Sequence, residues 1–194
     1  SFVSTGDDKV SVPVSSIGKS VYTFTSVIGD KIAYKTVDVT SSASVDLASG
    51  NAMTKIEGTL ANGSGSDVYF IAGDGSVFTA VVDGSKFTAY VPQGVNTVYA
   101  TNNSLAYFGT LADDNKIELK TADRIYGTVS WSDDVDYGYL SVDTEINGSK
   151  FTLMTYSDGR YQMYVPADMA VSFTVSEDNA ALSFKEEGGD KFVV

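Results

Sequence analysis

Apolar and polar residues alternate with a period of two along most of this chain. The alternating runs are rich in Val, Tyr, Phe and Thr, which suit the pleated, half-buried surface of a β-strand. The pattern allows a short helical turn only within residues 43–52, and we expect no long helix. The runs predict strands at residues 19–28, 31–39, 67–72, 76–82, 85–91, 138–146 and 150–156.

Glycine-containing pairs separate these runs. Such pairs reach positive φ at little steric cost and close tight hairpins. Short strands divided by frequent turns predict an all-β chain of antiparallel β-sandwiches. The turns are expected at residues 28–30 and 73–75, and at Asp83-Gly84, Asn147-Gly148 and Asp158-Gly159.

The chain has three prolines, and all three lie in the same local sequence. Pro13, Pro92 and Pro166 each follow a Val at the end of an alternating run, with spacings of 79 and 74 residues. Proline has no backbone N–H and cannot sit inside a central ladder, so we expect each Val-Pro to end a strand. A period in this range is typical of a tandem array.

A second motif repeats with the prolines. Residues 54–60, with Ile-x-Gly-Thr, match residues 123–129. The matches divide the chain into a partial repeat (1–50) and two sandwich repeats (51–121 and 122–194), joined by short linkers at 49–51 and 120–122.

The first repeat has the Val-Pro half but no Ile-x-Gly-Thr strand. We therefore expect a piece of a longer array. If Ser1 is instead a mature start, the first sheet leaves an edge that a strand of another copy can complete.

The order of these motifs resembles the carboxypeptidase regulatory-like family. The resemblance covers residues 54–194. It implies a transthyretin-like, Ig-like β-sandwich of about seven strands, with a non-catalytic spacer or accessory role. The matching positions are Ile56-Glu57-Gly58 with Asp83-Gly84 and Phe87, and Ile125-Tyr126-Gly127 with Asp158-Gly159 and Tyr161.

Composition narrows the classes of function. The net charge is −12 and the pI is near 4.2, which argues against nucleic acid and anionic membrane surfaces as partners. No apolar run is long enough to span a bilayer. The chain has no Cys and no His, which excludes disulfides, zinc fingers and catalysis by thiol or imidazole.

One acidic cluster is a candidate metal site. Asp133, Asp134 and Asp136, with Asp143 downstream, offer the carboxylate oxygens that Ca²⁺ prefers. Their spacing does not match an EF-hand loop, which favours a solvated acidic loop over a calcium site. No cofactor other than this Ca²⁺ is expected.

Aromatic and asparagine residues provide two further candidates. Trp131, Tyr137 and Tyr139 can stack on sugar rings if exposed, or pack in a core. Asn62, Asn102 and Asn147 begin N-x-[ST] triplets in expected loops and are candidate glycosylation sites. Asn147 is also the first residue of an expected hairpin turn.

These observations favour a non-catalytic structural or adhesive repeat segment of a prokaryotic cell-envelope protein, such as a surface layer, sheath or adhesin. Its location would be extracellular, and its partners would be neighbouring repeats. The alternative is a carbohydrate-binding accessory module of a secreted enzyme. No catalytic residue is predicted, because Ser64 lies outside any G-x-S-x-G elbow.

Overall fold

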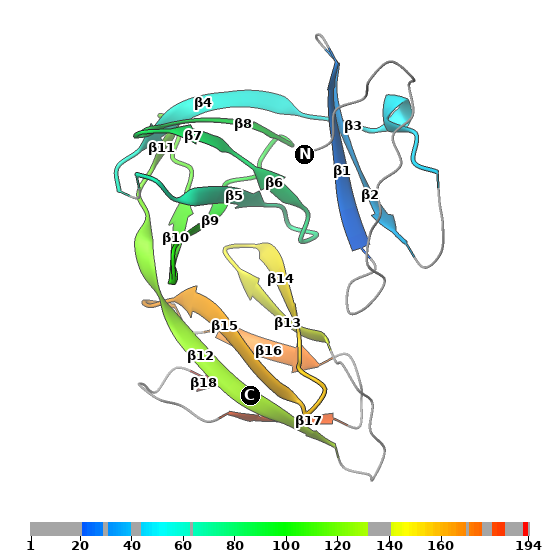
Figure 1. The fold of residues 1–194 in the computed structure, drawn as a ribbon, viewed down its shortest axis with the longest axis vertical. Coiled ribbons are helices and arrows are strands. Elements are labelled where there is room, and N and C mark those ends of the chain that lie inside the picture. Colours follow the sequence, from blue (N-terminus) through cyan, green and yellow to red (C-terminus); the bar gives the residue numbers. More distant parts are fainter. Residues whose placement is uncertain are drawn as a thin grey trace.

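The computed structural model describes residues 21–28, 31–39, 44–62, 64–131, 141–169, 171–175, 180–184 and 192–193. Throughout these ranges the chain forms β-strands, joined by turns and by one short 3₁₀ turn (Figure 1). The prediction of an all-β chain with antiparallel sheets is therefore confirmed.

The first three strands form a small sheet, which we call the N-terminal sheet. They are β1 (Val21–Ile28), β2 (Lys31–Asp38) and β3 (Asn51–Ala52), and their order is β1-β2-β3. The 3₁₀ turn η1 (Leu47–Ser49) precedes β3. The Asp46 carboxylate accepts a hydrogen bond from the backbone N–H of Ala48 (2.9 Å) and caps this turn. This is the helical turn expected within residues 43–52.

The next eight strands form the middle unit, in which two sheets pack face to face (Figure 1). One sheet, in the order β11-β4-β8-β7, holds β4 (Thr54–Leu60), β7 (Val81–Asp83), β8 (Lys86–Val91) and β11 (Lys116–Ile117). The facing strands are β5 (Asp67–Ile71), β6 (Val77–Thr79), β9 (Thr97–Asn102) and β10 (Leu105–Thr110).

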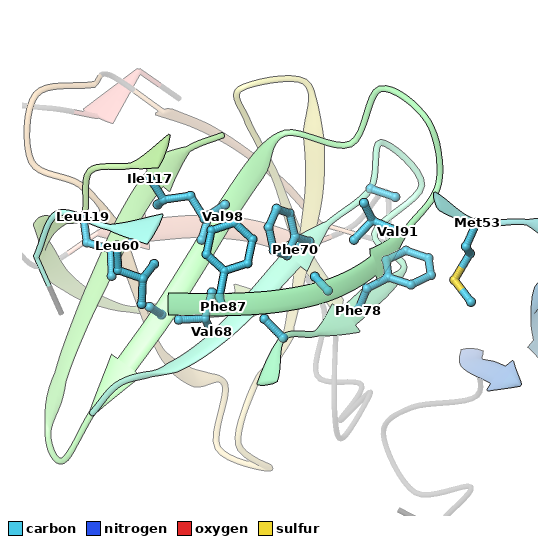
Figure 2. Packing of buried hydrophobic residues seen from close by; sticks show 14 residues of the cluster. Met53, Leu60, Val68, Phe70, Phe78, Phe87, Val91, Val98, Ile117 and Leu119 are labelled. Carbon is cyan, nitrogen blue, oxygen red and sulfur yellow. The ribbon is translucent and has the colours of Figure 1, made fainter. Parts of the chain in front are cut away.

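Buried side chains from both sheets meet in what we call the middle core (Figure 2). The run expected at 76–82 divides at Ala80. Its first part, β6, pairs with β5, and its second part, β7, pairs with β8, so this segment crosses from one sheet to the other. The core consists of Met53, Leu60, Val68, Phe70, Ala72, Phe78, Ala80, Phe87, Ala89, Val91, Val98, Ala100, Ile117 and Leu119.

The remaining strands form the C-terminal unit. Strands β12 (Lys120–Trp131), β15 (Arg160–Pro166) and β17 (Ala180–Phe184) extend the sheet of β9 and β10, which reads β15-β12-β10-β9-β5-β6 with β17 on β12. The facing sheet, β14-β13-β16-β18, holds β13 (Ser141–Ile146), β14 (Ser149–Met154), β16 (Val171–Val175) and β18 (Phe192–Val193).

The C-terminal core lies between these two sheets. Two of its buried members, Ala106 and Phe108, come from β10, a strand of the middle unit. The C-terminal unit therefore completes its core with side chains of the preceding unit. The full cluster is Ala106, Phe108, Ala122, Val142, Ile146, Tyr161, Val165, Val171 and Phe173.

The turn chemistry agrees with the sequence. Gly84 (φ 60°) and Gly159 (φ 78°) take positive φ, and so do Asn147 (φ 50°) and Gly148 (φ 75°) between β13 and β14. These values confirm the turns expected at Asp83-Gly84, Asn147-Gly148 and Asp158-Gly159.

Both Val-Pro pairs in the described part of the chain end a strand. Strand β8 stops at Val91 and β15 stops at Pro166. The carbonyls of Pro92 and Pro166 then accept hydrogen bonds from the backbone N–H three residues later, both at 3.3 Å. The third proline, Pro13, lies outside the described residues.

The glycine of Ile-x-Gly-Thr is required by a close backbone approach. A Cβ built on Gly58 would lie 2.0 Å from the carbonyl oxygen of Asn115 and 2.7 Å from the ring of Phe87. The backbone N–H of Thr59 donates to the same Asn115 carbonyl at 3.1 Å, so the segment before β11 runs directly over β4. Gly127 holds the corresponding position in β12, opposite Tyr161.

The linker expected at residues 120–122 is instead part of β12. Lys120 and Thr121 pair with β10, and Ala122 pairs with Pro166 of β15, so ladder pairing passes without a break from one unit to the next. Residues 49–51 lead directly from η1 into β3.

We expect Gly58→Ala to lower the free energy of unfolding by about 1–3 kcal/mol, because the added methyl group overlaps a backbone carbonyl that cannot move away freely. Urea unfolding followed by circular dichroism measures this change. Thr59→Ala, at an exposed position of the same strand, is the control. A Gly58→Ala protein as stable as this control would show that the approach of Asn115 is not constrained.

Candidate functional site: the junction between the middle and C-terminal units

Strand β12 belongs to the ladders of both units. Lys120 pairs with Phe108 and Thr121 with Tyr107, in antiparallel register with β10. From Ala122 to Thr128 the same strand pairs with β15. Figure 1 shows β12 as one long ribbon that leaves the middle unit and runs the length of the C-terminal unit. The connection between the units is thus a hydrogen-bonded strand.

An aromatic cluster packs beside this strand. The ring of Phe151, on β14, lies 5.5 Å from that of Phe108 and 6.5 Å from that of Tyr99, both in edge-on geometry. Tyr99 and Phe108 are themselves 5.2 Å apart. Edge-to-face aromatic pairs contribute about 0.5–1.5 kcal/mol each beyond the area they bury. Phe151 therefore anchors the C-terminal unit on two strands of the middle unit.

The β13–β14 hairpin also forms hydrogen bonds to the middle unit. The Ser149 hydroxyl donates to the carbonyl of Ile71 at 2.7 Å, in a buried position. The backbone N–H of Lys150 donates to the carbonyl of Gly73 at 3.3 Å. The Thr97 hydroxyl donates to the carbonyl of Asn147 at 3.1 Å. These bonds fix the tip of the hairpin against the ends of β5 and β9.

Strands β9 and β10 are covered on both faces. Val98 and Ala100 point into the middle core, whereas Tyr99, between them, packs against the C-terminal core. In β10, Ala106 and Phe108 are buried in the C-terminal core, and Tyr107 packs against the middle core. The two units therefore share one sheet as a common wall.

Tyrosine hydroxyls lie around this wall. Burial raises the pKa of the Tyr99 phenol above 10.0, and the nearby Tyr164 and Tyr69 phenols raise it further. The rings of Tyr69 and Tyr99 stack at 6.4 Å. The Tyr164 hydroxyl donates to the carbonyl of Ser104 at 3.3 Å, which ties β15 to the β9–β10 turn. Burial also raises the pKa of Tyr161. The Tyr69–Tyr99 stacking and the Tyr164–Ser104 hydrogen bond thus add to the contacts that hold the two units together.

Of the four candidate calcium ligands, only Asp143 lies within the described residues. Asp133, Asp134 and Asp136 lie outside the described residues. Asp143, on β13, forms an ion pair with Lys150 (2.8 Å) and accepts a hydrogen bond from the Thr152 hydroxyl. Among described residues, no group of three or more acidic side chains is placed to hold a metal ion.

The aromatic candidates for sugar binding fall largely outside the described residues. Tyr137 and Tyr139 are not described, and of Trp131 only the backbone is, as the last residue of β12, opposite Ala180. Sugar binding by these three residues stays a prediction.

The three candidate glycosylation sites are described. Asn62 is exposed in the bend after β4, Asn102 is half-buried at the end of β9, and Asn147 is exposed at the tip of the β13–β14 hairpin. Asn147 forms the hairpin turn expected of it, and the hydroxyl of its triplet, on Ser149, is held by Ile71. Glycosylation at these positions stays a prediction.

The sequence does not single out the junction residues Phe108 and Phe151 as candidate functional residues. A partial signal was the order Gly-Ser-x-Phe, which residues 75–78 and 148–151 share. Residues 84–87 have the same order, with Phe87 in the middle core, so this order alone does not mark the junction.

Comparison of the chain with protein-family models, with curated proteins and with solved structures found no match. Within the described ranges, no helix has the length and apolar character needed to cross a membrane.

We expect Phe151→Ala to lower the free energy of unfolding by about 3 kcal/mol, because it empties a large site between the two units. We also expect the unfolding transitions followed by Trp131 fluorescence and by far-UV circular dichroism to coincide in the parent chain and to separate in this variant, since Trp131 is the single tryptophan and circular dichroism reports all strands. Tyr156→Ala, at an exposed aromatic of the same unit, is the control. Coincident transitions in a Phe151→Ala protein of unchanged stability would contradict the junction.

Alkaline pH should destabilise the folded chain through its buried phenols. The pKa values of Tyr99 and Tyr161 are raised on folding, so above pH 10.0 the unfolded state loses these protons first and stability falls as pH rises. Tyr99→Phe and Tyr161→Phe should each make this fall shallower, as measured by urea unfolding between about pH 8 and 11. Tyr156→Phe removes an exposed phenol and is the control. If stability fell equally steeply with pH in Tyr99→Phe, Tyr161→Phe and Tyr156→Phe, this role of burial would be contradicted.

Proposed function

We propose that this chain is a non-catalytic structural segment of a prokaryotic cell-envelope protein, built from tandem β-sandwich units. Its work is mechanical. Each unit forms a hydrophobic core and packs on its neighbour. The array of units then sets the distance between the segments of the parent protein on either side of it. Partners are the neighbouring units, with self-assembly by strand exchange as a further mode.

The observation that carries this proposal is the strand shared between the units. Because β12 pairs with β10 and then with β15, a load along the chain crosses the junction through ladder hydrogen bonds. The packed rings of Tyr99, Phe108 and Phe151 support the same boundary. Large apolar interfaces restrict the relative motion that a flexible linker between domains permits.

The strand pairing supports a transthyretin-like, Ig-like sandwich of the carboxypeptidase regulatory-like kind. The motif positions that carry this resemblance meet across strands, Gly58 opposite Phe87 and Gly127 opposite Tyr161. The middle unit has eight strands, or seven runs when β6 and β7 are taken as one crossing segment.

An acidic surface supports an extracellular setting. A net charge of −12 favours a soluble, exposed surface, which suits an extracellular segment of a cell-envelope protein. Protease treatment of intact source cells tests the location, since a surface-exposed protein is cleaved while cytosolic markers are not. Protection of the chain in intact cells would count against it.

Pulling single molecules tests the mechanical role. With the chain placed between marker domains, we expect the middle and C-terminal units to show no separation step at low force, because their junction is a paired strand. Phe151→Ala should introduce such a step, and Tyr156→Ala should not. Units that part at low force in the parent chain would overturn the proposal.

A glycan array distinguishes the alternative of a carbohydrate-binding accessory module. Polysaccharide binding that Trp131→Ala abolishes would favour that function over a purely structural one.

A further inference from the structure

The N-terminal sheet contacts the middle unit through β2. The ring of Tyr34 packs edge-on against that of Phe78, at 5.0 Å and 87°. The backbone N–H of Met53 donates to the carbonyl of Ile32 at 3.2 Å. Ile32 and Tyr34 both pack against the middle core. The middle unit therefore also completes its core with side chains from the preceding strand.

Strand pairing puts this contact in the same register as the β10–β12 junction. Asn51 lies opposite Tyr34, and Lys120 lies opposite Phe108. Position 34 of β2 therefore corresponds to position 108 of β10 in the pairing with the following strand. In this register Ile32 corresponds to Ala106, which is again part of the following core.

The following unit brings the same hairpin to both contacts. Phe78 ends the sequence Gly-Ser-Val-Phe and Phe151 ends Gly-Ser-Lys-Phe, and each packs edge-on against the corresponding aromatic, Tyr34 or Phe108. The serine of each hairpin forms a hydrogen bond of 2.7 Å to the preceding part of the chain, on the docking strand β2 in the first contact and on β5 in the second. Ser76 bonds with the Thr36 hydroxyl, and Ser149 bonds with the Ile71 carbonyl.

We infer that β2 and β10 present the same docking surface, and that the partner it fits is a following β-sandwich of this kind. That partner supplies a Gly-Ser-x-Phe hairpin and the first two residues of its entering strand. The surface supplies an apolar residue and, two positions later, an aromatic ring. This inference deepens the proposed structural function and rests on it for the role of the array.

Three contacts of different kinds make the docking directional. Strand pairing fixes the register, and a slip of one residue would turn Tyr34 or Phe108 to the opposite face. The edge-on rings fix the separation of the two elements. A serine hydrogen bond restrains the hairpin tip in both contacts, to Thr36 of β2 in the first and to Ile71 of β5 in the second. Each unit is thereby held in the same orientation on the one before it.

Distance measurements between spin labels test the inference on the full chain. The chain has no cysteine, so labels attach only at introduced positions. Thr25→Cys with Lys86→Cys spans the first contact, and Lys86→Cys with Thr174→Cys spans the second, all at exposed positions. We expect one narrow distance distribution for each pair. Phe78→Leu should abolish the narrow distribution of the first pair only, and Phe151→Leu that of the second only.

Two controls keep the test specific. Phe87→Leu makes the same change inside the middle core and should leave both distributions narrow. The double variant Val77→Lys with Lys150→Val exchanges the x residues of the two Gly-Ser-x-Phe sequences, which are otherwise identical. Both side chains are exposed, so both distance distributions should stay narrow. Displacement of either distance by this exchange would overturn the inference, as would a folded Phe78→Leu or Phe151→Leu chain that keeps both distributions.

Failure of this inference is distinguishable from failure of the proposed function. Distances that respond as expected in a chain that binds polysaccharide through Trp131 would leave the docking surface in place and replace the structural role. Distances unchanged by both Phe78→Leu and Phe151→Leu, in a chain whose units do not separate at low force, would remove the docking surface and leave the structural role in place.

Discussion

The burial of β9 and β10 on both faces is the constraint on which the rest of this structure depends. A sheet with one solvated face needs only one core, but this sheet supplies Val98 and Ala100 to one core and Ala106 and Phe108 to another. Separation of either core from this sheet would expose apolar side chains of β9 or β10, strands that also supply side chains to the other core. The energetic boundary between the units is therefore a shared layer, and the pairing of Lys120 and Thr121 with β10 follows from it.

Local chemistry made much of the fold predictable. Asn147-Gly148 and the two described Val-Pro pairs behave as expected, because positive φ and a missing N–H act within a few residues of chain. The linker expected at 120–122 lies instead within β12. Lys120 and Thr121 are polar and exposed, so the sequence gives no sign that they pair with a strand elsewhere in the chain. Which strands become neighbours is a tertiary property that alternation alone does not encode.

The candidate site was harder to predict for a related reason. Trp131 and the acidic cluster are conspicuous in the sequence. Phe151 and Ser149, on β14, become conspicuous only through their contacts with β5, β9 and β10 in the structure. Tyr99 illustrates the difficulty. Tyrosine fits a half-solvated strand face as well as a core boundary, so its alternation with Val98 and Ala100 looks the same in either case.

The matched registers of β3 and β12 bear on how such a chain changes over generations. If residues 51–119 were removed by recombination, Lys120 would follow Gly50 and take the place of Asn51 opposite Tyr34. Thr121 would likewise replace Ala52 opposite Ala33. The new boundary would keep the pairing of the old ones. Duplication of the same segment would leave every boundary equally intact, so the length of the protein can vary by whole units without a new interface having to evolve.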